Sequence, residues 1–573
     1  MSSAADDRTW DCARSMTGPS LGDSRGVLVA ASFIWLLGAC GKARDGTDGH
    51  ANGDGLGGAL GGGTGQEPGG TTSVGGTSGG RRSSGMATGG RWGAAGDAEP
   101  LYVKASNTDA GDLFGVSVAL SGDGSTLAVG ANREASASRG VGASDADNFL
   151  ADSGAVYVFS RSEGAVEQQA YVKASNSGAG DGFGSSVAVS ADGSTLAIGA
   201  PFEASAATGI DGDQVDDSFE GSGATYVFAR RGDSWEQQAY IKASNADADD
   251  FFGTSVALSA DGSTLAVGAD GADGSSRGVD GDPSDAEASE AGAVYLLTRS
   301  GGVWEEQALL KASNAEAWDH FGASVALSAD GNTLAVGAAW EDSATTGVDG
   351  DQNDDSMPYA GAVYVFGRDG AAWQQRAYLK PAQNDGGDNF GSAVALSADG
   401  NLLAVGAVGD DSAATGIDGD ANDNSMPFAG AAYLFERDGS SWQQQAYLKA
   451  SNTDEGDEFG YHLSLSGSGN TLVVGAALEA STARGFDGDQ YDNSAPEAGA
   501  VYVFSRDAGP WGQRAFIKAP SSDAGDRFGW SMALSTDGDL LLVGASREAS
   551  AATGLDGDQN DNSTPRAGAA FLY

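Results

Sequence analysis

Aspartates recur at fixed spacing in this sequence, in a pattern that suits a hard metal ion. Six glycine-containing segments carry aspartates at relative positions 0, 2 and 5, as in Gly-Val-Asp-Gly-Asp-Gln-Asn-Asp at 347–354. Ca²⁺ takes about six to eight oxygen ligands in forgiving geometry, and carboxylates this close repel one another without a cation. The pattern predicts calcium as a cofactor, with these ligands: Asp211, Asp213 and Asp216; Asp280, Asp282 and Asp285; Asp349, Asp351 and Asp354; Asp418, Asp420 and Asp423; Asp487, Asp489 and Asp492; Asp556, Asp558 and Asp561.

A further acid stands eight residues before the first aspartate in most of these segments. Its copies are Glu203, Glu341, Asp410, Glu479 and Glu548. The segments are not EF-hand loops, because the glycine at position six and the glutamate at position twelve are missing. The alternative to metal binding is that Asp and Asn side chains cap turns through hydrogen bonds to the backbone.

The aspartate segments belong to a longer repeat, which is marked most clearly by Phe-Gly two residues after an aspartate. Seven copies run from Phe114-Gly115 to Phe528-Gly529, each 69 residues after the last, as from 114 to 183. A fixed period of this kind indicates a repeat architecture. An aspartate before each Phe-Gly and a lysine such as Lys311 recur in all seven copies, and residues present in every copy are expected to support the fold.

Each repeat contains four short segments with the composition of strands. In the fourth copy these are residues 308–312, 324–328, 334–338 and 362–366, bounded by Gly, Asp, Ser or Asn. Asp-Gly turns such as 330–331 are typical of β-hairpins. No stretch has a sustained helical period. Seven repeats of four strands predict an all-β fold, a seven-bladed β-propeller of four-stranded antiparallel blades.

The Phe-Gly, the following Gly-Ala (Gly199-Ala200-Pro201 in the second copy) and the later Gly-Ala-Val-Tyr-Val-Phe resemble FG-GAP repeats. These repeats build the N-terminal propeller of integrin α-chains and many bacterial surface proteins. The resemblance implies that Phe-Gly precedes the innermost strand of each blade. It also implies that residues 101–105, ahead of the first Phe-Gly, complete the last blade. Integrin-type calcium loops lie between the first two strands, where this chain has a short turn, so that site does not carry over.

The composition limits the partners of the chain. It has 31 Lys and Arg against 80 Asp and Glu, a formal net charge of −49. This balance argues against nucleic acid or an anionic membrane surface as partner. It fits cation binding, or solubility at high ionic strength. The acidic loops are expected on one face of the ring, where a protein or glycan ligand would bind.

The N-terminal region carries an export signal. Residues Val27–Leu37 are an apolar run, too short to span a bilayer, and Leu37-Gly38-Ala39-Cys40 resembles the end of a bacterial lipoprotein signal. We therefore expect a signal peptide over 1–39, lipidation of Cys40, a flexible Gly/Ser/Thr-rich linker over 40–98 and the propeller over 99–573. The protein would be exported and tethered, by its lipid anchor alone, to the outer membrane or cell surface.

Location and family analogy together predict a surface recognition or adhesion module. A lectin-like carbohydrate-binding propeller and a purely structural envelope protein are the alternatives. The sequence also predicts that the protein is not an enzyme, because His50, His320 and His462 assemble no catalytic set and no asymmetric site is visible among the near-identical blades.

Overall fold

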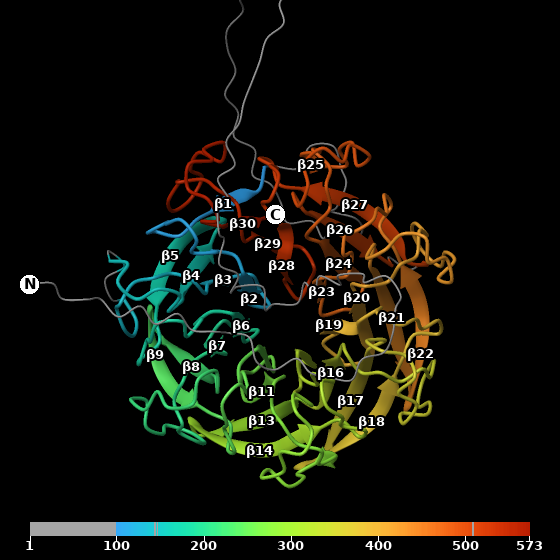
Figure 1. Cartoon of the computed structure of the whole chain (residues 1–573). Coiled ribbons are helices and arrows are strands. Elements are labelled where there is room, and N and C mark those ends of the chain that lie inside the picture. Colours follow the sequence, from blue (N-terminus) through green and yellow to red (C-terminus); the bar gives the residue numbers. More distant parts are fainter. Residues whose placement is uncertain (1–98, 143–144, 146, 507–508) are drawn as a thin grey trace, which may run out of the picture. The chain divides into compact units, whose positions relative to one another are not determined.

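The computed structural model describes residues 99–573, except 143–144, 146 and 507–508. The predicted signal peptide, the linker and Cys40 lie outside the described residues. In the described part, β-strands form seven antiparallel sheets, which are the blades of a propeller arranged in a ring (Figure 1). No helix of this part is long and apolar enough to cross a membrane.

Each blade runs from an inner strand at the centre of the ring to an outer strand at its edge. The strands of blades 1 to 3 are β2 (Ser117–Leu120), β3 (Thr126–Ala131), β4 (Ala155–Ser162) and β5 (Ala165–Val172); β6 (Ser186–Val189), β7 (Thr195–Ala200), β8 (Ala224–Arg231) and β9 (Ser234–Ile241); β10 (Ser255–Leu258), β11 (Thr264–Ala269), β13 (Ala293–Ser300) and β14 (Val303–Lys311), with β12 (Gly278–Val279) added outside β14.

Blades 4 to 7 repeat this order. Their strands are β15 (Ser324–Leu327), β16 (Thr333–Ala338), β17 (Ala362–Asp369) and β18 (Ala372–Leu379); β19 (Phe390–Leu396), β20 (Leu402–Ala407), β21 (Ala431–Asp438) and β22 (Ser441–Leu448); β23 (Leu463–Leu465), β24 (Thr471–Ala476), β26 (Ala500–Ser505) and β27 (Gly512–Lys518), with β25 (Gly485–Phe486) outside β27; β28 (Phe528–Leu534), β29 (Leu541–Ala545), β30 (Ala569–Leu572) and β1 (Leu101–Val103).

The last blade takes its outer strand from the start of the propeller. Strand β1 pairs antiparallel with β30, with Leu101 opposite Leu572 and Val103 opposite Ala570. This is the pairing predicted for residues 101–105. It covers the edge of β30, which would otherwise be an open strand edge.

Packing within and between neighbouring blades explains why Phe-Gly recurs in every blade. In blade 4 the ring of Phe321 is fully buried, with its centroid 5.3 Å from that of Tyr364 and 6.0 Å from that of Phe366. Gly322 has a φ of 101°, and a Cβ there would lie 2.5 Å from the backbone oxygen of Ala293 in blade 3. The glycine is therefore needed both by its backbone conformation and by the close approach of two blades.

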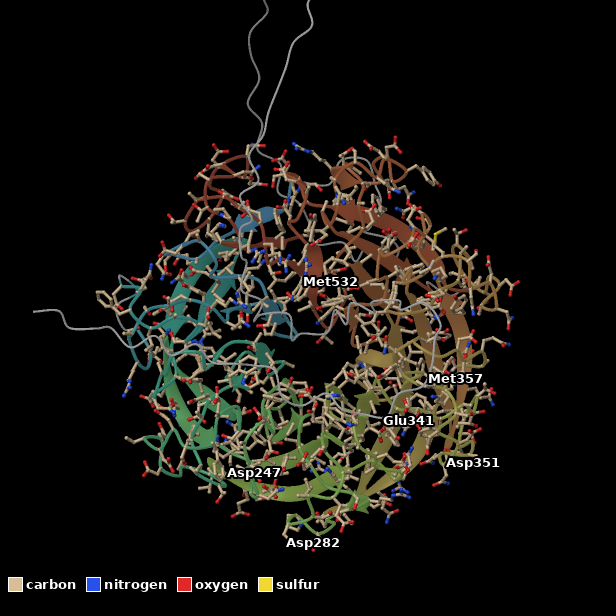
Figure 2. All side chains as sticks on the ribbon, in the orientation of Figure 1. Asp247, Asp282, Glu341, Asp351, Met357 and Met532 are labelled. Atoms are coloured by element: carbon tan, nitrogen blue, oxygen red, sulfur yellow. The ribbon has the colours of Figure 1, made fainter. Side chains whose placement is uncertain are left out.

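The long loop between the second and third strands of each blade folds back onto the outer strand. In blades 3 and 6 this contact is the two-residue strand β12 or β25, and elsewhere it is a single bridge, such as Val348 with Leu379. The loops therefore extend toward the edge of the ring. Figure 2 shows Asp282 and Asp351 at the outer margin, whereas Met532 of the inner strand β28 lies near the centre.

Candidate ligand-binding junctions

The aspartates predicted to bind calcium make hydrogen bonds to the backbone of their own loops. Asp349 Oδ1 accepts a hydrogen bond of 2.9 Å from the backbone N–H of Tyr378, on outer strand β18. Asp351 and Asp354 each accept one from the N–H two residues further on, at 3.1 and 3.2 Å. The other five copies repeat these contacts.

These contacts are the turn caps that the sequence offered as the alternative to metal binding. Among residues 99–573, apart from the undescribed gaps, no group of three or more His, Cys, Asp or Glu side chains is placed to hold a metal ion. In six blades the first aspartate of the loop anchors it to the outer strand. Calcium binding by these loops stays a prediction.

The acid eight residues earlier has a different environment from the loop aspartates, since it is buried. Glu341 is 1% exposed and lies 3.0 Å from the ammonium group of Lys380, and the hydroxyl of Tyr378 donates to it at 2.8 Å. Six blades contain this pair of a buried acid and the lysine present in every copy: Lys104–Glu548, Lys173–Glu134, Lys242–Glu203, Lys380–Glu341, Lys449–Asp410 and Lys518–Glu479. Breaking such a pair would leave an uncompensated buried charge, so these acids support the fold.

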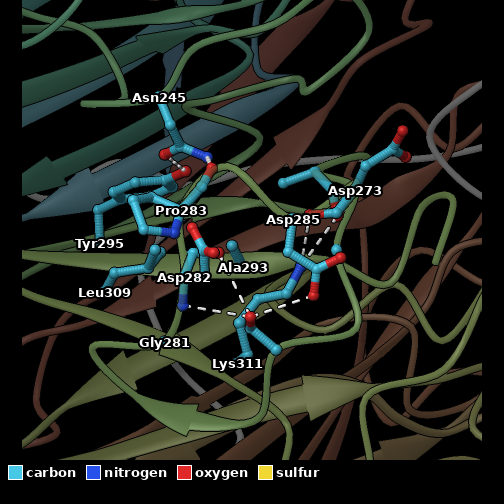
Figure 3. A pocket seen from close by; sticks show the side chains of 13 residues that line it. Asn245, Asp273, Gly281, Asp282, Pro283, Asp285, Ala293, Tyr295, Leu309 and Lys311 are labelled. Carbon is cyan, nitrogen blue, oxygen red and sulfur yellow. Dashed lines mark hydrogen bonds between the residues drawn. The ribbon is translucent and has the colours of Figure 1, made fainter. Parts of the chain in front are cut away.

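Blade 3 lacks the buried acid. Ala272 occupies its position, and Lys311 donates instead to the backbone oxygens of Ala272 and Asp273, at 3.2 and 2.9 Å (Figure 3). Burial lowers the pKa of Lys311 to about 8, and the nearest carboxylates, led by Asp250, only partly oppose that shift. One cavity, just large enough for a single water molecule, adjoins this lysine, with a volume of about 10 Å³.

The blades differ most from one another where they meet. The residue between Asp and Phe-Gly has a φ between 53° and 65° in every copy, a left-handed conformation that favours glycine. Only one copy is glycine, and all seven residue types differ. We call these the first junction residues: Leu113, Gly182, Phe251, His320, Asn389, Glu458 and Arg527.

A second position of the same kind lies before the third strand of each blade. It also has a left-handed φ, between 53° and 68°, and again only one copy is glycine. These second junction residues are Asp152, Gly221, Glu290, Tyr359, Phe428, Glu497 and Arg566. Each first junction residue donates its backbone N–H to the second junction residue of the preceding blade, as His320 does to Glu290 at 3.1 Å. The two positions together therefore form seven junctions on one face of the ring.

The junction between blades 3 and 4 combines aromatic and acidic side chains. His320 lies between two carboxylates, with Nδ1 3.7 Å from Asp270 and Nε2 3.5 Å from Glu290. Its ring also packs edge-on against Trp340, with centroids 4.4 Å apart, and Trp340 contacts Tyr359 at 5.6 Å. Burial raises the pKa of Glu290, and nearby aspartates raise it further against the opposing effect of His320.

The junction between blades 6 and 7 has the opposite character. Arg527 makes two hydrogen bonds to Glu497, at 2.9 and 2.7 Å, and its guanidinium lies 5.1 Å from the ring centre of Trp530. Arg547 lies 3.5 Å from the same carboxylate. Burial, with the charges of Arg527 and Arg566 in addition, lowers the pKa of Arg547 to about 10. Arginines therefore gather here in a strongly acidic chain.

The aspartate of each Asp-x-Phe-Gly lies beneath these junctions. Burial raises its pKa to about 7 or 8 in all seven copies, despite a hydrogen bond from the backbone N–H three residues earlier, as from Glu316 to Asp319 at 2.9 Å. Its role in supporting the fold stays a prediction. The junction residues themselves were not predicted. The signal for them was the variation of a single position inside a motif that is otherwise repeated seven times.

Comparison with known families identifies the repeat. The FG-GAP repeat model matches residues 235–297, 304–366, 373–435, 442–504 and 511–573, which together make up more than half of the chain. The chain therefore belongs to the FG-GAP repeat family. No curated protein matches the sequence.

Solved propellers align with the chain at low identity. A protein of Bacteroides uniformis assigned as a 6-phosphogluconolactonase is 11% identical, over 71% of this chain and 86% of its own, with a TM-score of 0.38. The periplasmic gluconolactonase PpgL of Pseudomonas aeruginosa is 16% identical, over 74% and 97%, with a TM-score of 0.40. The propeller domain of Cps50 (Swd1) from Myceliophteria thermophila is 10% identical, over 83% and 99%, with a TM-score of 0.42.

The prediction that the protein is not an enzyme is overturned by these comparisons. Two of the aligned structures carry lactonase names, and the comparisons give no ground for excluding catalysis. The premise of that prediction was also wrong, because the junctions differ from blade to blade and are therefore asymmetric sites. At these identities the likeness concerns the fold alone, and it assigns no activity to this chain.

Proposed function

We propose that this propeller is a recognition module of the cell surface, which binds its ligand at the junction face. One observation carries the proposal. The seven junctions share one backbone but present different side chains, and twelve of their fourteen left-handed positions are occupied by residues other than glycine. Such positions cost about 1 kcal/mol each for residues other than glycine. Because these side chains vary while the backbone that carries them stays the same, we assign them to the binding of a partner.

The test is a fourfold glycine variant in which His320, Asn389, Glu458 and Arg527 are replaced. Full-length protein on beads would be applied to arrays of glycans and of purified surface proteins. We expect the wild type to retain a discrete class of ligand and the variant to lose at least about tenfold in affinity. The matched control is Glu305→Gln, an exposed acid on outer strand β14. Equal retention by the wild type and the fourfold variant would contradict the proposal, as would no retention at all.

Export and lipid anchoring belong to the same proposal and rest on the sequence at 27–40. A fatty-acid label supplied to cells should enter the wild-type chain and not Cys40→Ser, which should be released into the soluble fraction. Absence of label from the wild type would remove the anchor from the proposal.

Calcium binding to the aspartate loops is the remaining part of the proposal. Titration of Ca²⁺ into chelator-treated protein should reveal five or six sites and a raised melting temperature. The control is a loop variant, Asp351→Asn with Asp354→Asn, which should lose one site. If millimolar Ca²⁺ produces neither heat nor a shift in melting, the aspartates are turn caps only.

A further inference from the structure

The junction between blades 3 and 4 exposes an aromatic side chain that contributes little to the core. Trp318 is 52% exposed, and Tyr359 of the next junction, which contacts Trp340, is 49% exposed; they are two of the few large hydrophobic side chains of the described residues that face solvent. Trp318 belongs to this junction because its backbone N–H donates to Ser289, beside Glu290, at 2.9 Å. Flat aromatic faces in such positions are typical of sites for sugars and organic cations.

The backbone at Trp318 is strained. Its φ is 76°, a conformation that is rare for an aromatic residue. The equivalent residue in the other six copies is glycine five times and aspartate once: Gly111, Gly180, Asp249, Gly387, Gly456 and Gly525. The half-exposed indole recovers little of this strain through packing. Strain held without a packing benefit is a feature of functional positions.

Polar groups at this junction lack close partners. Asp270 is 6% exposed, and its Oδ1 has no hydrogen-bond partner among the described residues. His320 Nε2 also has none, since its distance of 3.5 Å to Glu290 is too long for a good bond. Buried polar atoms are nearly always paired, and these two are hydrogen-bonding groups of this junction without a partner among the described residues.

The charge of the junction favours a cation. After burial, the negative charges of Asp270, Asp273 and Asp249 raise the pKa of Glu290, and His320 is the one basic side chain that opposes them. The described residues offer no group of side chains placed to hold a metal ion. An ammonium group supplies three N–H donors to carboxylates and is also attracted to aromatic faces.

We propose that the junction between blades 3 and 4 binds an aminosugar residue of a glycan. The ammonium group lies against Asp270 and Glu290, and the sugar ring lies on the exposed indole of Trp318. A sugar is favoured over a lysine side chain because the flat face of a sugar ring covers the open indole of Trp318. This inference rests on the proposed recognition function and names the ligand of one junction.

The experiment compares two oligosaccharides that differ only at nitrogen. A glucosamine tetramer and an N-acetylglucosamine tetramer are titrated into the full chain, at a pH where the free amine is protonated, with tryptophan fluorescence as the readout. We expect the charged tetramer to bind at least about tenfold more tightly, because acetylation removes the charge. Equal binding of the two tetramers, or binding of neither, would overturn the proposal.

Two kinds of variant locate the site. Trp318→Gly, which restores the residue type of five other copies, and Asp270→Asn should each weaken binding at least about tenfold without lowering the melting temperature. Glu305→Gln, elsewhere on blade 3, should bind as the wild type does. A lysine-rich peptide that binds as tightly as the sugar and competes with it would overturn the choice of ligand. If these variants change nothing while the fourfold glycine variant still loses ligand on the arrays, the proposed function stands and this inference fails.

Discussion

The two ends of the inner strands meet the same backbone requirement in opposite ways. At the hairpin end, the turn between the first two strands of each blade has a residue with a φ between 62° and 75°, and it is glycine in all seven copies. At the junction end, the two left-handed positions of each blade have similar φ values, yet they carry aromatic, acidic, basic and amide side chains. The sequence repeats itself at one end and diversifies at the other.

Space explains part of the difference. A Cβ on Gly331 would lie 2.8 Å from Oγ1 and 3.0 Å from Cβ of Thr264, in the neighbouring blade, so the hairpin end has no room for a side chain. At the junction end there is room for a side chain: the first junction residues are buried or half-buried, and some second junction residues, such as Arg566, are exposed. Room alone does not favour a strained side chain, however, because glycine would relieve the strain there as well. The comparison therefore separates glycines that the fold requires from side chains that we assign to ligand binding.

The largest effect is expected at the hairpin end. Gly331→Val should lower the free energy of unfolding by about 3 kcal/mol, through an unfavourable φ and overlap with Thr264. His320→Val, at a junction position of similar φ, should change it by less than about 1 kcal/mol. Urea unfolding of both variants measures these two free energies. Equal losses of unfolding free energy would contradict the difference between the hairpin end and the junction end.

The aspartates at the two ends should respond to pH in opposite directions. Burial raises the pKa of Asp319 to about 8, so the folded state binds a proton that the unfolded state releases above its own, ordinary pKa. This residue therefore makes stability fall as pH rises from about 4 toward 8. Asp319→Asn should increase the free energy of unfolding by roughly 2 kcal/mol near neutral pH and by little near pH 4.

At the hairpin end the corresponding change should destabilise. Partial burial alone would raise the pKa of Asp330, but hydrogen bonds from Ser328 and Asn332 outweigh it and hold the pKa below its ordinary value. Asp330→Asn should therefore lower the free energy of unfolding by about 0.5 kcal/mol at neutral pH, an effect that disappears as the pH falls below the pKa of Asp330. Changes of the same sign in Asp319→Asn and Asp330→Asn would contradict the account.

The smallest effect tests the strain itself. Arg566 has a φ of 59° and an exposed side chain, so Arg566→Gly removes strain and little else. We expect the free energy of unfolding to rise by about 0.5 kcal/mol, and the pKa of Arg547 to rise as a neighbouring charge is lost. A stability loss greater than about 1 kcal/mol would show that this side chain serves the fold.

The sequence predicted the propeller well because period, turn residues and strand composition all indicate the same fold. Blade number, the Asp-Gly hairpins and the pairing of residues 101–105 with the last blade follow from the position of Phe-Gly. The role of the loop aspartates could not be decided in the same way, since turn caps and calcium ligands use the same residue types at the same spacing.

The junctions were missed for a different reason. The predictions rested on residues that recur in every copy. The residue before Phe-Gly has seven different types, so it was not among them, although this variation is visible in the sequence. The pairing of Lys380 with Glu341 was equally hidden, because it joins two recurring residues 39 positions apart through the fold. The exception at Ala272 and Lys311 becomes visible only against the six pairs that the structure shows.

The central claim is that the junction side chains serve binding and not folding. Its most direct test is the free energy of unfolding of the variant with His320, Asn389, Glu458 and Arg527 replaced by glycine. The account predicts a value equal to that of the wild type or higher, within about 1 kcal/mol, because the relief of four strained positions offsets the loss of side-chain contacts such as that of Arg527 with Glu497. A loss of more than about 3 kcal/mol would contradict it, since the junction side chains would then be part of what holds the ring together.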